Sequence, residues 1–141
     1  MQDFNVSTDP NKVDLEVVFE FVSDSYWAKG IPRKTLVKAV QNSLVFGVYE
    51  NNRNMVGFAR IVTDKATFAY LGDVFVLPAF QGKGLAKLLM QSIVSHPDIQ
   101  GLRRFMLATR DAHSLYAKFG FQTVENSEML MQIWQPSIYS K

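Results

Sequence analysis

One stretch of the sequence constrains the fold more than any other: residues 73–90, which read DVFVLPAFQGKGLAKLLM. An apolar strand is predicted up to Leu77, Pro78 ends it, and a helix with one apolar face is predicted over 84–95. A strand that passes through a glycine-bearing loop into a helix directs the unpaired N–H groups of the helix start, and the positive end of its dipole, beyond the strand. This arrangement predicts an anion-binding loop.

Two glycines and two lysines favour a diphosphate as the anion. Gly82 and Gly84 lack a Cβ, so a ligand can approach the main chain closely. Lys83 and Lys87 oppose the helix dipole, which costs about 0.3–1 kcal/mol each unless an anion occupies the turn. Two better-known phosphate loops do not fit, because Lys83 is not followed by Ser or Thr and Lys87 stands where a dinucleotide fingerprint needs glycine. The alternative is a turn whose glycines serve geometry alone.

The remaining elements follow from periodicity. Helices are predicted over 13–26 and 33–42, and a β-rich meander over 43–50, 55–63 and 67–77. Beyond the helix over 84–95, we expect a strand over 104–109, a helix over 112–119, and a closing pair of strands over 121–124 and 129–134. The predicted order is β-α-α-β-β-β-α-β-α-β-β, an α+β layer structure.

Composition excludes several classes of site. The length of 141 residues fits one domain over 1–141, and the absence of cysteine excludes disulfides, thiolate metal sites and a covalent acyl-cysteine intermediate. With only two histidines, no metal site is expected. A net charge of +2 is too small to predict a nucleic-acid or membrane partner. The N-terminus lacks the pattern of a secretory signal and no apolar run reaches the roughly 18 residues of a spanning helix, so we expect a cytoplasmic protein.

The hexapeptide QGKGLA at 81–86 resembles the Gln/Arg-x-x-Gly-x-Gly/Ala signature of the GCN5-related N-acetyltransferases, the GNAT superfamily. The preceding VFVLP at 74–78, the later YAKFGF at 116–121, and the order of elements over nearly the whole chain strengthen this resemblance. It implies a GNAT-like (acyl-CoA N-acyltransferase) fold, with a mixed, mostly antiparallel central sheet and helices on both faces. It also implies acetyl-CoA as the co-substrate.

The same resemblance implies which residues bind acetyl-CoA. In the family, main-chain N–H groups of the loop hold the pyrophosphate; here these residues are Gln81, Gly82, Lys83, Gly84, Leu85, Ala86 and Lys87. Val74, Phe75 and Val76 would meet the pantetheine arm and the acetyl group, in the manner of an added strand. Gln81 replaces the commoner arginine, which removes one charge but leaves the backbone donors.

Acetyl transfer from a thioester to an amine requires a base for the amine, a donor for the oxyanion and an acid for the departing thiolate. Tyr116 matches the tyrosine that the family places near the CoA sulfur, and the alternative is an aromatic packed in the core. The N–H of Val76 is the candidate oxyanion donor. Asp73, in an apolar strand, is a candidate base, or else a carboxylate satisfied by backbone donors. Tyr70, or a water that it orders, is the other candidate, because Tyr70 and Gly72 stand where some relatives carry a strand glutamate.

The acceptor amine is expected beside the loop between the first two helices. Tyr26 and Trp27 precede a Gly-Ile-Pro turn there, and Arg60 and Phe68 on the meander are expected to complete the pocket. Core or interface packing is the alternative for the two aromatic residues.

Two functions therefore stand open. The first is an N-acetyltransferase that moves the acetyl group of acetyl-CoA to a primary amine of a small molecule or peptide, by direct attack in a ternary complex. The second is a non-catalytic acyl-CoA-binding sensor or assembly module. A nucleic-acid module around Arg103 and Arg104 has little support, because no aromatic stripe accompanies the charges. The apolar segment 129–134 is a candidate edge for a homodimer.

Overall fold

The computed structural model describes residues 3–140, and within that range five strands form one sheet. The sheet order is β1-β2-β3-β4-β5, with β1 at Phe4–Ser7, β2 at Leu44–Glu50, β3 at Asn54–Thr63, β4 at Phe68–Val76 and β5 at Arg104–Leu107. Neighbouring strands are antiparallel except β4 and β5, which are parallel. The predicted α+β class and the mixed, mostly antiparallel sheet are confirmed.

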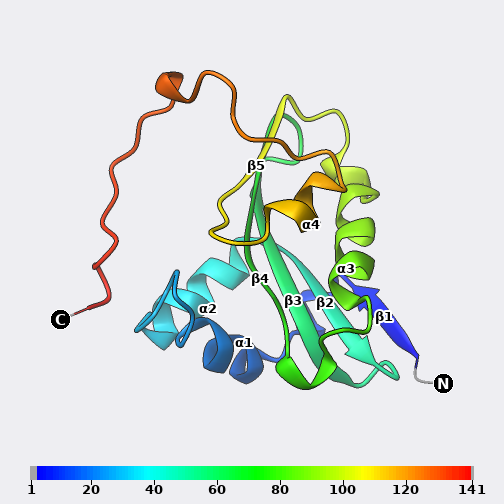
Figure 1. The fold of residues 1–141 in the computed structure, drawn as a ribbon. Helices are drawn as coiled ribbons and strands as arrows, with labels where there is room; N and C mark the ends of the chain where they lie inside the picture. Colours follow the sequence, from blue (N-terminus) through cyan, green and yellow to red (C-terminus); the bar gives the residue numbers. More distant parts are fainter. Residues whose placement is uncertain (1–2, 141) are drawn as a thin grey trace.

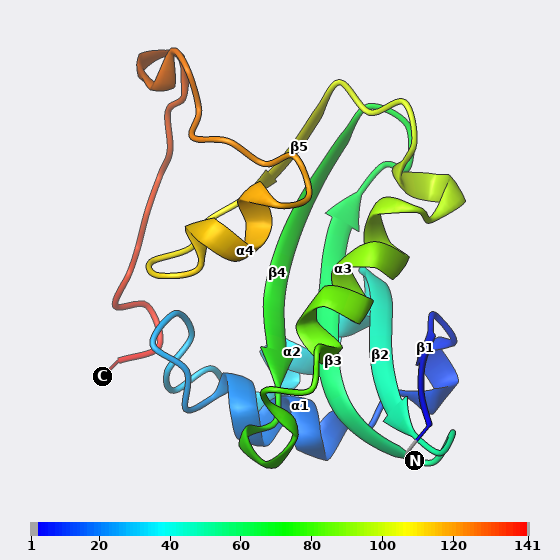
Figure 2. The same cartoon turned by 45° about the vertical axis from the view of Figure 1, so that its right-hand side comes forward.

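Helices cover both faces of the sheet (Figures 1 and 2). α1 (Leu15–Val22) and α2 (Arg33–Gln41) lie on one face, in a core built around Val18, Leu36 and Phe58. α3 (Leu85–Val94) and α4 (His113–Ala117) lie on the other, in a core that includes Leu89 and Ile61. The strands alternate their side chains between these two cores, as a sheet buried on both faces requires.

The first helix is shorter than the predicted range of 13–26. It ends at Val22, where the Ser25 hydroxyl donates a 2.6 Å hydrogen bond to the Val22 carbonyl and accepts a 3.1 Å bond from the amide of Ala28. These two bonds replace the next helical turn with a bend. Tyr26 and Trp27 consequently leave the helix and lie in the loop before α2.

A β-bulge in β4 changes the direction of its side chains. Phe58 pairs with Phe75 and Arg60 with Gly72, so Asp73 and Val74 together face the single residue Ala59. Asp73 has a φ of 52°, in the left-handed region. Before the bulge, odd-numbered residues such as Leu71 enter the α3 core, and after it Val74 does. The bulge therefore turns the Asp73 carboxylate toward the α1 side of the sheet.

β4 and β5 run together only at one end. Their pairing extends from Phe68 with Arg104 to Leu71 with Leu107, where β5 stops while β4 continues to Val76. Figure 2 shows the chain moving away from β4 after β5 ends, while β4 continues. Residues 72–76 of β4 therefore have no strand on the β5 side, which leaves an open edge inside the molecule.

The predicted closing strands over 121–124 and 129–134 are wrong. Residues 122–138, which we call the C-terminal arm, are exposed throughout and contain only one short 3₁₀ helix, Ser127–Met129. A strand needs a neighbour for its N–H and C=O groups, and the arm runs away from the sheet (Figure 1). The β-rich composition of 129–134 therefore has no partner within the described residues.

Candidate active site

The loop between β4 and α3 exposes main-chain donors. Gln81 (φ −70°, ψ 155°) and Gly82 (φ 81°) have the angles of a type II turn, which requires glycine at its second central position. Gly84 begins α3 with φ 78° and provides no side-chain cap. The amides of residues 84–87 have no hydrogen-bond acceptor among the described residues. These donors, at the positive end of the helix, are arranged to bind an anion.

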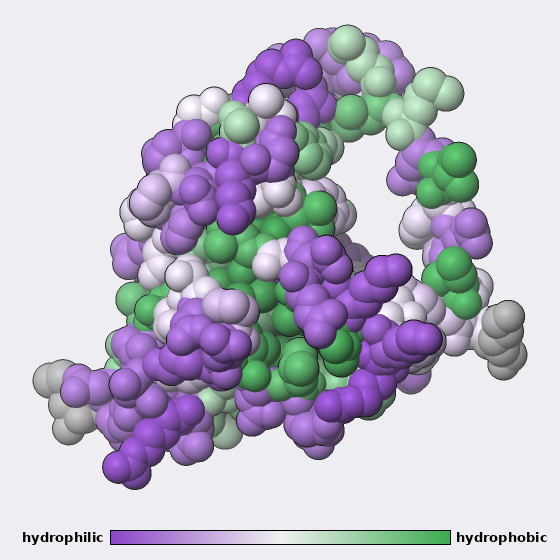
Figure 3. Space-filling view, turned by 180° about the vertical axis from the view of Figure 1, so that it is seen from behind, coloured by the Kyte–Doolittle hydropathy of each residue, from purple (hydrophilic) through white to green (hydrophobic). Residues whose placement is uncertain are grey.

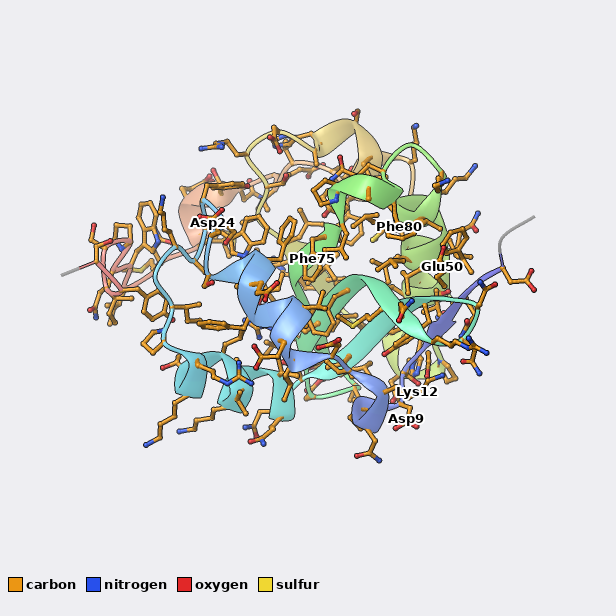
Figure 4. The ribbon with its side chains drawn as sticks, turned by 90° about the horizontal axis from the view of Figure 1, so that it is seen from below. Asp9, Lys12, Asp24, Glu50, Phe75 and Phe80 are labelled. Atoms are coloured by element: carbon orange, nitrogen blue, oxygen red, sulfur yellow. The ribbon has the colours of Figure 1, made fainter. Side chains whose placement is uncertain are left out.

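Two contacts hold this loop in place. The Phe80 ring packs edge-on against Phe4 of β1, with 6.2 Å between centroids. The Gln81 side chain donates a 3.0 Å hydrogen bond to the Val76 carbonyl. Figure 4 shows Phe80 in the loop that leads to α3. Gln81 thus ties the loop to the end of β4.

A shallow hollow of about 480 Å³ lies over the start of α3. Lys83, Gly84 and Lys87 line it, together with Asp3 from the N-terminal segment. Apart from the adjoining residues of the chain, no described residue has an atom within 4 Å of where a Cβ would stand on Gly82 or Gly84. The space outside the loop is therefore open to a ligand. The hollow also carries a net positive charge, because two lysines face the single carboxylate of Asp3.

The open edge of β4 carries main-chain groups at Val74 and Val76. Leu77 donates to the Val56 carbonyl of β3 at 2.8 Å. Hydrogen bonds alternate in direction along an antiparallel strand, so the N–H and C=O of Val76 point away from β3. The Phe75 side chain lies elsewhere, buried and stacked on Phe21 of α1 at 4.2 Å (Figure 4). This edge of β4 therefore exposes the amide of Val76, whereas the Phe75 side chain points into the α1 core.

Asp73 connects the sheet to the loop before α2. One carboxylate oxygen accepts a 2.6 Å hydrogen bond from Nε1 of Trp27, and the other forms a 2.6 Å ion pair with Nε of Arg60. Arg60 also donates to the Ser43 hydroxyl at 3.2 Å. The Asp73 side chain is 6% exposed and both of its oxygens are engaged. It positions Trp27 and Arg60 rather than presenting a free base.

Tyr116 lies buried on α4, where it borders a hollow of about 830 Å³ between β5, α4 and residues 119–125; we call this space the β5 hollow. Burial raises the pKa of the Tyr116 hydroxyl, and the nearby Tyr26 and Asp111 add to the rise. The phenol consequently keeps its proton at neutral pH and can act as an acid. Its ring packs 6.0 Å from Phe121.

Tyr26 connects the loop before α2 to the loop between β5 and α4. Its hydroxyl accepts a 3.2 Å hydrogen bond from the amide of Arg110, and the Arg110 guanidinium lies 3.9 Å from its ring centroid. Its ring packs edge-on against Trp27 at 5.1 Å. Arg110 was not among the candidates from the sequence, since a lone arginine in a loop carries no recognisable signal.

An apolar area lies uncovered on the α1 side of the sheet. Phe68 and Tyr70 of β4 and Val62 of β3 are each more than a third exposed there. Figure 3 looks onto the molecule from behind and shows hydrophobic side chains gathered at the centre, framed by hydrophilic ones. Phe68 and Tyr70 thus share a face with Asp73, and this face is the candidate acceptor surface.

Comparison with known proteins identifies the family of the chain. Residues 41–123 match the family model described as "Acetyltransferase (GNAT) domain". The chain belongs to the GNAT acetyltransferase family. A crystal structure of a GNAT-family protein from Xanthomonas campestris pv. campestris is similar over 99% of this chain and 98% of that one, with 47% identity and a TM-score of 0.95. The GNAT-like fold is thereby confirmed.

Two further proteins extend the comparison. A Gibberella zeae protein assigned provisionally as an acetyltransferase is 32% identical over 82% of this chain and 77% of its own length. An acetyltransferase from Clostridium acetobutylicum, described with acetyl-CoA, shares the fold with a TM-score of 0.65 and 17% identity over 94% of this chain and 96% of that one.

Two absences concern the described part of this GNAT chain. Within residues 3–140, no group of three or more metal-ligating side chains gathers in one place. Over the same residues, no helix is long and apolar enough to cross a membrane.

The Asp73 network predicts a difference between two substitutions. Asp73→Ala leaves Arg60 partly buried without its partner and should lower the free energy of unfolding by about 3 kcal/mol. Asp73→Asn should cost about half as much, because asparagine tolerates a positive φ and still accepts from Trp27. Urea denaturation measures both, and fluorescence in a Trp134→Phe background reports on Trp27.

Asp98→Ala is the matched control. It breaks an exposed pair with Lys65 at 3.9 Å and should change stability by less than about 0.5 kcal/mol. If Asp73→Ala were as mild as this control, Asp73 would not hold the site together.

The raised pKa of Tyr116 predicts a pH dependence of stability. In the unfolded chain tyrosine ionises near a pKa of about 10, whereas the folded protein keeps the Tyr116 proton to higher pH. The contribution of the un-ionised Tyr116 to stability is therefore complete below the unfolded pKa of about 10, and it is lost as the pH rises above that value. Urea denaturation between pH 9 and 11 should show a smaller fall in stability for Tyr116→Phe than for the unmodified protein; equal falls would contradict the burial argument.

Proposed function

We propose that this chain transfers the acetyl group of acetyl-CoA to a primary amine of a small molecule or peptide. The observation that carries the proposal is the set of unpaired amides at the start of α3, beside the open edge of β4. GNAT enzymes use acetyl-CoA, and both features fit that molecule: the first faces its diphosphate and the second its amide-bearing arm.

The residues proposed for binding acetyl-CoA divide into two groups. Main-chain donors of the loop would hold the diphosphate, with Lys83 and Lys87 adding charge; the loop comprises Gln81, Gly82, Lys83, Gly84, Leu85, Ala86 and Lys87. Of these, Gln81 acts by holding the loop, because its amide and its side chain already donate within the protein. The main chain at Val74 and Val76 would pair with the arm, and Phe75 would support that edge from the core.

Each requirement of the reaction has a candidate group. Acetyl-CoA supplies a thioester, in which attack by the amine forms a C–N bond and breaks the C–S bond. The amide of Val76 would donate to the oxyanion. Tyr116 would give its proton to the departing thiolate. A water held by the Tyr70 hydroxyl would take the proton of the amine and pass it to solvent, since both oxygens of Asp73 are occupied.

The acceptor would lie on the α1 side of the sheet. Tyr26 and Trp27 form one wall, Phe68 and Tyr70 the floor, and the Asp73–Arg60 pair fixes Trp27 in place. The surface is aromatic and has no cluster of free carboxylates, which favours an amine attached to an apolar or peptide group over a polyamine.

The test is release of free thiol from acetyl-CoA in the presence of a panel of amines and peptides. Tyr116→Phe should lower kcat by about 10²-fold while leaving acetyl-CoA affinity nearly unchanged. Tyr49→Phe is the matched control. The Tyr49 hydroxyl is buried and has no hydrogen-bond partner among the described residues. It lies in the α1 core, on the opposite face of the sheet from Tyr116, so its loss should leave kcat unchanged.

The alternative function, a sensor or assembly module that binds acyl-CoA without turnover, gives a different result. It predicts calorimetric binding of acetyl-CoA but no amine-dependent thiol release from any member of the panel. Absence of binding would contradict both functions.

A further inference from the structure

Arg110 has an exposed guanidinium that is held in place but has no polar partner. The guanidinium lies over the ring of Tyr26, 3.9 Å from the ring centroid. The hydrogen bond to the Tyr26 hydroxyl comes from the backbone amide of Arg110, so it does not use the side chain. Within residues 3–140, this guanidinium takes part in no ion pair and no hydrogen bond. The acetyl-transfer chemistry described above does not use its charge.

A guanidinium stacked on an aromatic ring is prepared to bind an anion. Its five N–H groups lie in the plane of the cation, so a ring against one face leaves all of them free. The cation–π contact stabilises this position by about 0.5–1 kcal/mol at an exposed site, which reduces the entropy lost when a ligand binds. A carboxylate or a phosphate accepts two of these parallel hydrogen bonds at once. Arg110 therefore offers a site for one of these two anions.

Tyr26 places this cation beside the proposed acceptor surface. The loop before α2 and the loop between β5 and α4 are joined by the contacts of Tyr26 with Arg110 (Figure 2). The Tyr26 ring also packs against Trp27, which donates to Asp73. Burial raises the pKa of Tyr116, and Tyr26 is close enough to add to that rise. An anion bound to Arg110 would thus lie close to both the acceptor wall and the proposed acid.

The charges around Arg110 favour a single carboxylate over a phosphate. Arg60, the other arginine of the acceptor wall, is already paired with Asp73. Asp111 is exposed, does not cap α4, whose N-cap residue is Ala112, and forms no ion pair with any described residue. Its negative charge would oppose a phosphate dianion and attract an ammonium group. A molecule that carries one amine and one carboxylate suits this neighbouring pair of charges.

We propose that the acceptor acetylated by this chain is an aminocarboxylate, and that Arg110, stacked on Tyr26, binds its carboxylate. The proposal rests on the acetyl-transfer function proposed above and narrows its acceptors to amines such as amino acids and short peptides with a free C-terminus. The exposed aromatic rings of Trp27, Phe68 and Tyr70 would contact the apolar body of such a molecule. Arg110 is thus a specificity-determining residue and takes no part in bond making.

Paired acceptors that differ in the carboxylate test the proposal. The pairs are phenylalanine with phenethylamine, para-(aminomethyl)benzoate with benzylamine, and a dipeptide with its amidated form, so that the spacing of amine and carboxylate varies. For the preferred carboxylate acceptor, Arg110→Gln should lower kcat/KM about 30-fold more than for its carboxylate-free partner, mostly through KM. Because the ratio is taken within each pair, differences in amine reactivity cancel.

Two further variants separate the guanidinium fork from its charge. Arg110→Lys keeps the charge but loses the planar fork, so its ratio should lie between those of the unmodified protein and Arg110→Gln. Arg53→Gln is the matched control, since Arg53 is exposed in the turn between β2 and β3 and forms no ion pair with any described residue. If Arg110→Gln changed the ratio no more than this control for all three pairs, the proposal would be overturned.

Binding of the acetylated products tests the same site without acetyl transfer. The carboxylate product of at least one pair should shift the backbone amide of Arg110 in ¹⁵N spectra and bind about 10-fold more tightly than its carboxylate-free counterpart. Arg110→Gln should remove that advantage. Equal affinities within every pair, an advantage that survives Arg110→Gln, or no binding at millimolar concentration would overturn the proposal. If no amine releases thiol, the proposed function fails, and this titration still decides whether the carboxylate site exists.

Discussion

A helix cannot satisfy its own first amides, and the start of α3 shows how this protein uses that constraint. Gly84 opens the helix without a side-chain cap, and the amides of residues 84–87 find no acceptor in the described chain. The loop is kept open by contacts made elsewhere, Phe80 on Phe4 and Gln81 on Val76. In the proposed complex, the neighbouring edge of β4 would meet the pantetheine arm of acetyl-CoA.

A single inserted residue in β4 determines how the acceptor side of the site is arranged. Without the bulge, Asp73 would face the apolar core of α3; with it, Asp73 reaches Trp27 and Arg60 on the opposite face. Because the strand pairs with β3 on both sides of the bulge, the acceptor surface and the open edge of β4 are parts of one element. This arrangement is consistent with preorganised catalysis, in which the donors are fixed before the reaction.

Local sequence was sufficient for the turn between β4 and α3, because glycines at a strand-to-helix turn determine the backbone there whatever surrounds them. The antiparallel meander of β2, β3 and β4 and the apolar faces of the helices followed from periodicity, which is also a local property of the sequence. Asp73 could not be assigned, since its role depends on a bulge and on Trp27, 46 residues earlier in the chain. The closing strands over 121–124 and 129–134 failed because strand formation depends on a neighbour, and composition alone does not reveal whether that neighbour lies in the same chain.

Amide chemical shifts of ¹⁵N-labelled protein, recorded during titration with acetyl-CoA and separately with S-acetylpantetheine, test the central claim most directly. The account predicts that acetyl-CoA shifts the amides of residues 84–87 strongly, whereas S-acetylpantetheine, which lacks the diphosphate, leaves them nearly unchanged. Strong binding of acetyl-CoA with these amides unmoved would contradict it.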